Sequence, residues 1–133
     1  MLFTKASEYA LLASIYLMDE EYPQDVEKIA AELCLSKAFL AKILQSLAKD
    51  GVLKSFKGAG GGFCLARSAN EIKLKEIAEA AEKHELKVFV CSDGNSPCDP
   101  SRVAKCKVHP FFMALQSKVD DFLSSLTLAD LRK

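Results

Sequence analysis

The stretch SKAFLAKILQSLAKDGVLKSFKGAGGGFCLA, residues Ser36–Ala66, decides the fold. Its first part predicts a helix that is capped by Ser36 and runs to about Lys49, because Asp50 and Gly51 then supply residues that commonly end a helix. Apolar residues recur there at intervals of three and four, so one face of the helix is expected to be buried. That face comprises Phe39, Leu40, Ile43, Leu44 and Leu47.

The second part of the stretch predicts a β-hairpin. Val52–Phe56 and Phe63–Ala66 are short and rich in strand formers, and they flank the glycine-rich loop Lys57–Gly62. Two such runs around a glycine loop are typical of a hairpin whose connection is longer than two residues. A phosphate-binding nucleotide loop is a weak competitor, because the Gly-Lys-Ser/Thr ending of a P-loop is missing.

Helical spacing predicts further helices on both sides of the stretch. They are expected at about Leu2–Met18, Val26–Leu33 and Leu74–Lys83, from Pro110 to about Leu126, and in a short segment after Thr127. Two helices joined by a brief turn and followed by a hairpin form a winged helix-turn-helix. The expected fold class is therefore mainly α, with a winged helix-turn-helix headpiece, a small β-hairpin wing and a long C-terminal helix.

The chain is neutral as a whole, with 18 basic and 18 acidic residues, but its middle is basic. Six basic residues and one acidic residue lie between Ser36 and Arg67. A basic helix beside a basic glycine loop favours double-stranded DNA as the partner over ordinary helix packing, because lysines neutralise phosphates and glycines allow close approach. The candidate DNA-binding residues are Ser36, Lys37, Ala38, Ala41 and Lys42 on the helix, with Lys57, Gly58 and Gly60 in the wing.

A polar segment late in the chain, CSDGNSPCDPSRVAKCKVH, carries three cysteines and a histidine. Thiolates and imidazole suit iron–sulfur clusters and zinc, and the glycine and prolines let the segment fold back on itself. The candidate metal ligands are Cys91, Cys98, Cys106 and His109. The other two cysteines, Cys34 and Cys64, lie in apolar patterns and are expected to be buried core residues.

The cysteine usage and the N-terminus favour a reducing cytosol. Five cysteines is an odd count, nothing at the N-terminus resembles a signal peptide, and the first apolar stretch is too short to span a bilayer. A metal centre is therefore favoured over a disulfide. A structural zinc site of the Cys3His type remains an alternative. An enzyme is not expected, because there is no Cys-x-x-Cys and no Ser/His/Asp set, and His84 lies in a charged stretch.

The C-terminal helix carries a seam of the coiled-coil kind. Apolar residues repeat at intervals of 3, 4, 3 and 4 over Phe112, Leu115, Val119, Phe122 and Leu126. We expect this seam to pair with a second copy, although packing on its own headpiece is possible. We accordingly divide the chain into a winged helix-turn-helix domain (1–83), a cysteine-rich cluster-binding loop (84–109), and a dimerisation helix with its tail (110–133).

Three motifs in this order resemble the Rrf-type winged-helix regulators, the family that includes IscR, NsrR and RirA. They are the wing KGAGGGFCLA (Lys57–Ala66), the loop ending CKVH (Cys106–His109) and the tail FLSSLTLADL (Phe122–Leu131). The resemblance covers nearly the whole chain. It implies a homodimeric, cytoplasmic bacterial transcription factor that senses iron–sulfur status, nitric oxide or redox state through a bound cluster.

The resemblance also implies site residues. Cys91, Cys98 and Cys106 match the three cysteine ligands of a 2Fe–2S or 4Fe–4S cluster, which oxygen can remove from an aerobic preparation. His109 matches the fourth ligand of IscR-like proteins, and Glu8 matches the acidic ligand that NsrR-like proteins supply from the partner's first helix; we favour His109. The chain departs from the pattern in its slightly longer cysteine spacing and in Ala41, where IscR has an acidic base-reading residue.

Overall fold

The computed structural model describes residues 3–89 and 98–132. The described residues form a mainly helical fold with one antiparallel hairpin, as the sequence predicts. In chain order the elements are α1 (Lys5–Met18), α2 (Val26–Leu33), α3 (Lys37–Lys49), β1 (Leu53–Phe56), β2 (Gly62–Leu65), the 3-10 helix η1 (Ala69–Glu71), α4 (Leu74–Glu82), α5 (Pro100–Lys105), α6 (His109–Ser125) and the 3-10 helix η2 (Leu128–Leu131).

The helix boundaries follow from local capping. Ser36 caps α3, since its Oγ accepts a hydrogen bond from the Phe39 amide at 3.5 Å, and Gly51 follows the helix with a φ of +82°. α1 begins at Lys5, later than expected, because Thr4 is its N-cap and accepts a hydrogen bond from the Ala6 amide at 3.1 Å. A capping side chain fixes the first turn by satisfying an amide that has no partner within the helix.

The start of α1 is tied to the end of α4 by one carboxylate. Glu82 Oε2 accepts hydrogen bonds from the Thr4 amide at 3.1 Å, the Thr4 hydroxyl at 2.6 Å and the Ser7 hydroxyl at 2.5 Å. Partial burial alone would raise the pKa of Glu82, but the hydrogen bonds from Ser7 and Thr4 outweigh it and hold that pKa below its usual value. α1 and α4 therefore form one rigid pair.

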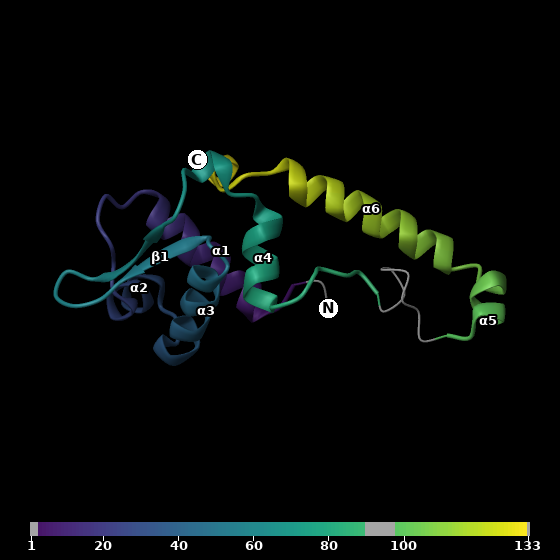
Figure 1. Cartoon of the computed structure of the whole chain (residues 1–133), viewed down its shortest axis with the longest axis horizontal. Helices are drawn as coiled ribbons and strands as arrows, with labels where there is room; N and C mark the ends of the chain where they lie inside the picture. Colours follow the sequence, from purple (N-terminus) through teal and green to yellow (C-terminus); the bar gives the residue numbers. More distant parts are fainter. Residues whose placement is uncertain (1–2, 90–97, 133) are drawn as a thin grey trace.

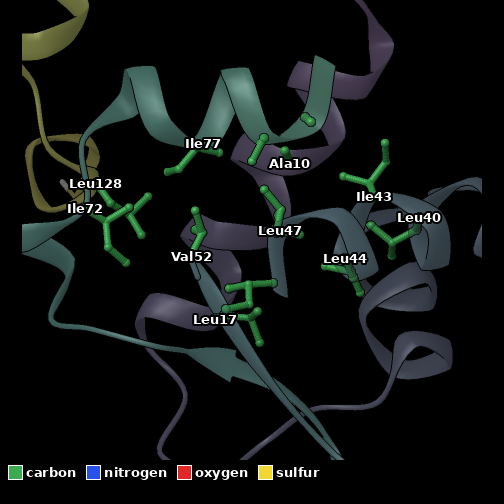
Figure 2. Packing of buried hydrophobic residues seen from close by; sticks show 14 of the residues in the cluster. Ala10, Leu17, Leu40, Ile43, Leu44, Leu47, Val52, Ile72, Ile77 and Leu128 are labelled. Atoms are coloured by element: carbon green, nitrogen blue, oxygen red, sulfur yellow. The ribbon is translucent and has the colours of Figure 1, made fainter. Parts of the chain in front are cut away.

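A single core joins the headpiece, residues 3–83, to the C-terminal tail (Figure 2). Leu40, Ile43, Leu44 and Leu47 of α3 are buried, so four of the five predicted positions are confirmed. The fifth, Phe39, is partly exposed and packs edge-on against Tyr9, with ring centroids 5.0 Å apart. Leu128 of η2 is fully buried beside Ile72, so the chain returns to the headpiece after α6 (Figure 2).

The two cysteines expected in the core have different surroundings. The expectation is wrong for Cys34, which is exposed. Cys34 ends α2 in the left-handed conformation, with a φ of 56°, and this geometry turns its side chain away from the apolar stripe of the helix. Cys64 is half-buried on β2, opposite Lys54 in the hairpin register.

The wing is a hairpin with one extra backbone pairing. β1 and β2 pair from Leu53↔Leu65 to Phe56↔Gly62, and Gln24 pairs with the other edge of β2 through two hydrogen bonds to Phe63, of 2.8 and 3.0 Å. Gly62, with a φ of +140°, lies against this third segment, because a Cβ there would lie 2.3 Å from the Gln24 carbonyl oxygen. The segment before α2 thus fixes the base of the wing.

Replacing Gly62 with Ala is therefore expected to reduce the free energy of unfolding by about 3 kcal/mol, because the new methyl would overlap backbone atoms and break the Gln24–Phe63 pairing. Gly60→Ala is the matched control. Gly60 also has a positive φ, +77°, but open space around its Cβ position, so a loss of about 1 kcal/mol is expected. Urea denaturation measures both, and equal losses would contradict the role of Gly62.

α5 and α6 extend from the headpiece as an arm, with α5 at its far end (Figure 1). α6 contacts α4 through a small second core of Ala78, Leu86 and Leu123, with Val119 at its edge. Beyond α6, Thr127 begins η2 as predicted, and the Leu128 amide donates to the Ile72 carbonyl at 2.8 Å. No helix in the described ranges is long and apolar enough to cross a membrane.

Candidate nucleic-acid interface and metal loop

The face of α3 that points away from the core is exposed and basic. Lys37, Lys42, Gln45 and Lys49 are exposed there, with the small residues Ala38, Ala41 and Ala48 between them. Small side chains leave the backbone accessible, while the lysines carry positive charge beyond it. This surface, which we call the α3 face, can approach a polyanion closely.

Two of the predicted residues on α3 already have partners within the headpiece. Lys37 forms an exposed ion pair with Glu27 of α2. The Ser36 amide donates to the Tyr9 hydroxyl at 3.4 Å, which leaves the Ser36 side chain as the cap of α3. An exposed ion pair contributes at most about 1 kcal/mol, so Lys37 can exchange Glu27 for another anion at small cost.

The predicted wing residues lie together at the tip of the hairpin. Lys57, Gly58 and Gly60 are all exposed, and the Gly61 amide closes the turn by donating to the Gly58 carbonyl at 3.0 Å. Gly58 and Gly60 have φ values of +85° and +77°, in the region that favours glycine. The tip therefore presents one lysine on a narrow, unobstructed turn.

The α3 face forms a ridge between two hollows. The wing-side hollow, of about 510 Å³, is lined by Gln45, Ala48, Lys49, Ser55, Phe56, Lys57, Gly62 and Phe63. The α4-side hollow, of about 850 Å³, is lined by Lys42, Gln45, Ser46, Lys49, Asp50, Val52, Glu76, Glu79, Ala80, Lys83, His84 and Glu85. Gln45 and Lys49 line both hollows, so they stand on the ridge itself.

The predicted metal ligands lie along the far end of the arm. Cys98 precedes α5, Cys106 ends it, and His109 is the first residue of α6; all three are partly exposed. The remaining predicted ligand, Cys91, lies outside the described residues. The sequence did not predict α5, in which Pro100 occupies the first turn and Asp99 accepts a hydrogen bond from the Ser101 amide at 2.8 Å.

The donor types fit a cluster, because thiolates and imidazole are its ordinary protein ligands. In the described residues, no group of three or more His, Cys, Asp or Glu side chains lies close enough together to hold a metal ion. α5 separates Cys98 from Cys106, and its six residues span about 9 Å along its axis. The two cysteines therefore flank α5, one at each end.

The alternative ligand Glu8 lies elsewhere. It is exposed in the first turn of α1, within the headpiece, whereas α5 and the start of α6 are at the far end of the arm (Figure 1). Glu8 and His109 of one chain therefore do not share a site. An acidic ligand from α1 would have to come from a second copy.

Both ends of the cysteine loop, residues 84–109, are attached to α6. Gln116 is 8% exposed, and its amide accepts from the Val88 amide at 2.7 Å and donates to the Leu86 carbonyl at 2.8 Å. Phe112 stacks on Phe89, with ring centroids 4.5 Å apart. The loop therefore starts against the middle of α6 and ends at its first residue. No pattern in the sequence indicates this role of Gln116.

The predicted seam on α6 divides between two faces. Phe112, Val119 and Leu126 are half-buried, whereas Leu115 and Phe122 are exposed, Phe122 by 63%. Phe111, which the seam did not include, is 60% exposed. Helical spacing puts Phe111, Leu115, Lys118 and Phe122 on one stripe, which we call the outer stripe.

Comparison with known proteins gives a consistent result. Residues 3–133 match the family model Rrf2, described as an iron-dependent transcriptional regulator. An HTH-type transcriptional regulator of Aquifex aeolicus is 34% identical over 98% of this chain and 91% of the relative. Among solved structures, CymR, the global cysteine regulator of B. subtilis, has a TM-score of 0.75 at 25% identity, covering 97% of this chain and 94% of CymR. IscR of T. potens has a TM-score of 0.71 at 28% identity, covering 96% and 83%.

Proposed function

The chain belongs to the Rrf2 family of transcriptional regulators, and we propose that it is a homodimeric bacterial regulator whose DNA binding responds to iron–sulfur, nitric oxide or redox status. The family is one of DNA-binding regulators and not of enzymes. The observation that carries the proposal is the attachment of both ends of the cysteine loop to α6, the helix that bears the outer stripe. A regulator of chromosomal genes works in the bacterial cytoplasm.

In the proposed complex the α3 face enters the major groove of double-stranded DNA and the wing tip enters the adjacent minor groove. Lys42 and Lys49 neutralise phosphates and release counterions, and Ala38 and Ala41 let the helix approach the base edges. Ser36 holds the first turn of α3, and Lys37 exchanges Glu27 for a phosphate. Gly58 and Gly60 keep the wing narrow enough for Lys57 to reach the minor groove.

Replacing Lys57 with Ala is expected to weaken operator binding several-fold and to reduce the slope of log K against log salt by about 1, because one phosphate contact is lost. Fluorescence titration at several salt concentrations measures both quantities. Lys105→Ala removes the same charge from the arm, which is outside the proposed DNA interface. The salt slope of this variant should therefore equal that of the unmodified protein. An unchanged slope for Lys57→Ala would remove the wing tip from the interface.

The outer stripe supports a two-fold dimer. Its members Phe111, Leu115, Lys118 and Phe122 follow each other at intervals of 4, 3 and 4, so their spacing is the same read from either end. When two copies of α6 cross antiparallel about a two-fold axis, Phe111 of each meets Phe122 of the other, and Leu115 meets Lys118. An isologous interface needs this self-complementarity. Two heads related in this way can read two half-sites of a two-fold operator.

The proposed cluster ligands are Cys91, Cys98 and Cys106, with His109 as the fourth and Glu8 of the second copy as the alternative. When bound, the cluster supplies a redox- and nitric oxide-reactive group with a defined ligand geometry. His109 is suited to the fourth position because it follows Cys106 by three residues and begins α6. The proposed cluster is of the 2Fe–2S or the 4Fe–4S type, since cysteine thiolates hold either.

The chain's own contacts suggest how the loop acts on DNA binding. Drawing Cys98 and Cys106 together shortens the loop, and Gln116 and Phe112 transmit the change to α6. A shift of α6 alters the spacing or tilt of the two heads, so the loop acts as a ligand-biased two-state element. Titrating one operator with the iron-loaded and the cluster-free protein tests this mechanism. Identical affinity and identical preference among operators would contradict it.

A further inference from the structure

We propose that Gln45 is the specificity-determining residue of the α3 face, and that its amide reads the major-groove edge of an adenine in the operator. The proposal rests on the proposed DNA-binding function and adds the residue and the base that set its sequence preference. Gln45 is exposed, and within the described part of the chain its side-chain amide has no hydrogen-bond partner. To read a base, a side chain needs a hydrogen-bond donor and acceptor that are not already bonded within the protein, and the amide of Gln45 offers both.

The position of Gln45 on α3 favours this role. The buried residues Leu40, Ile43, Leu44 and Leu47 define the core side of the helix. At 100° per residue, Gln45 points about 150° away from the centre of that group, so it projects outward with Ala38 and Lys49. Of its four nearest neighbours on the helix surface, Ala41 and Ala48 are small, and the lysines Lys42 and Lys49 are exposed. Gln45 is therefore the longest uncharged polar side chain on the α3 face, and the two alanines leave room for its approach to a base.

The charges of the two hollows indicate how the duplex lies across the ridge. The residues that line the wing-side hollow include Lys49 and Lys57 and no carboxylate. The residues that line the α4-side hollow include four acidic residues, Asp50, Glu76, Glu79 and Glu85, against three lysines, Lys42, Lys49 and Lys83. A phosphodiester backbone is therefore attracted more strongly to the first hollow than to the second. With one backbone in the wing-side hollow, the adjacent ridge residue Gln45 meets the base edges of the major groove.

The chemistry of the amide selects the base. A glutamine side chain presents an N–H donor and a carbonyl acceptor side by side, and adenine presents the matching N7 acceptor and N6 donor in the major groove. The lysines of the α3 face offer donors alone, so they neutralise phosphates or bind guanine but do not select adenine. Ala38 and Ala41 have no polar group. Selection of adenine from α3 therefore depends on Gln45.

The test is selection of operators from a pool of randomised DNA duplexes, using the full chain purified without oxygen. The unmodified protein should select a motif that contains one strongly preferred A·T pair per half-site. Gln45→Leu, which removes the polar atoms, should lose the preference at that pair and bind the selected operator about ten- to a hundredfold more weakly. Gln45→Glu, which keeps the shape but offers acceptors alone, should shift the preference at that pair toward cytosine.

Lys49→Ala is the control for a merely electrostatic effect, because it should weaken all sequences alike and leave the base preference unchanged. Circular dichroism of each variant should match the unmodified protein, since both residues are exposed. The same motif with the same preference at every position in Gln45→Leu and Gln45→Glu would overturn the assignment of Gln45 while leaving the proposed function intact. If the unmodified protein selected no motif, the proposed function itself would fail, and the inference with it.

Discussion

A variant in which Cys91, Cys98 and Cys106 are all replaced by Ala is expected to purify as a colourless dimer with a single DNA affinity. The unmodified protein, in contrast, should have visible absorbance, and its operator affinity should differ about 5- to 150-fold between the cluster-bound and cluster-free forms, the usual range of allosteric coupling. The physical reason is that the variant lacks the thiolates that bind the cluster. Its headpiece core and outer stripe should remain, because Cys98 and Cys106 belong to neither.

The matched control for this variant replaces the other two cysteines. Cys34 ends α2 and Cys64 lies on β2, so a Cys34→Ala/Cys64→Ala protein should keep the absorbance and the cluster-dependent response. Absorbance spectra, iron and sulfide assays, and fluorescence titrations with operator DNA measure these differences. A triple variant that retained both colour and response would exclude the cysteine loop as the cluster site.

Replacing both Phe111 and Phe122 with Glu is expected to convert the dimer to a monomer at micromolar concentration and to reduce operator affinity by about a hundredfold or more. Each aromatic ring is more than half exposed in the single chain, so the change removes an apolar contact between copies without opening the core. Aromatic side chains that act as interface hot spots contribute about 2 kcal/mol or more each, and joining two heads multiplies affinity by roughly 10² to 10⁴.

The control for the dimer variant is Met113→Glu. Met113 is 37% exposed on the same helix, but it lies outside the outer stripe. This change should leave both the oligomeric state and the operator affinity unaltered. Analytical ultracentrifugation and DNA titration give the two readouts. If the Phe111/Phe122 variant sedimented as a dimer, the contact between copies would have to use another surface.

The headpiece could be predicted from sequence because its signals are local. The stretch Ser36–Ala66 contains its own helix cap, its own apolar spacing and its own glycine turn, and each of these was observed. The 3-10 helix after Thr127 also followed from a local capping pattern. Where neighbouring residues determine the conformation, the sequence pattern is sufficient to predict the structure.

Other features depend on residues far apart in the chain. The pairing of Gln24 with Phe63, the hydrogen bonds between Gln116 and both Leu86 and Val88, and the burial of Leu128 join distant segments, and no local pattern predicts them. Cys34 was misassigned because its apolar neighbours suggested a core position, whereas the left-handed turn after α2 exposes it.

The candidate site was predictable to a similar extent. Residue types made the wing lysine and the cysteine loop candidates, and the structure adds how the loop is attached to α6 through Phe112 and Gln116. The lysines of the α3 face stand out in the sequence. Gln45 does not, because its place on the ridge depends on the two hollows that flank α3. Charge patterns can be read along a sequence, whereas a ridge depends on the elements packed on either side.

We propose above that thiolates of the cysteine loop bind an iron–sulfur cluster that sets the DNA affinity of the dimer. The iron and acid-labile sulfide content of protein prepared without oxygen from iron-supplied cells, read together with its visible spectrum, tests this cluster directly. We expect brown protein with iron and sulfide in comparable amounts. Colourless protein that lacked sulfide, whether it carried zinc or no metal, would contradict the claim and leave a winged-helix DNA-binding protein without a cluster.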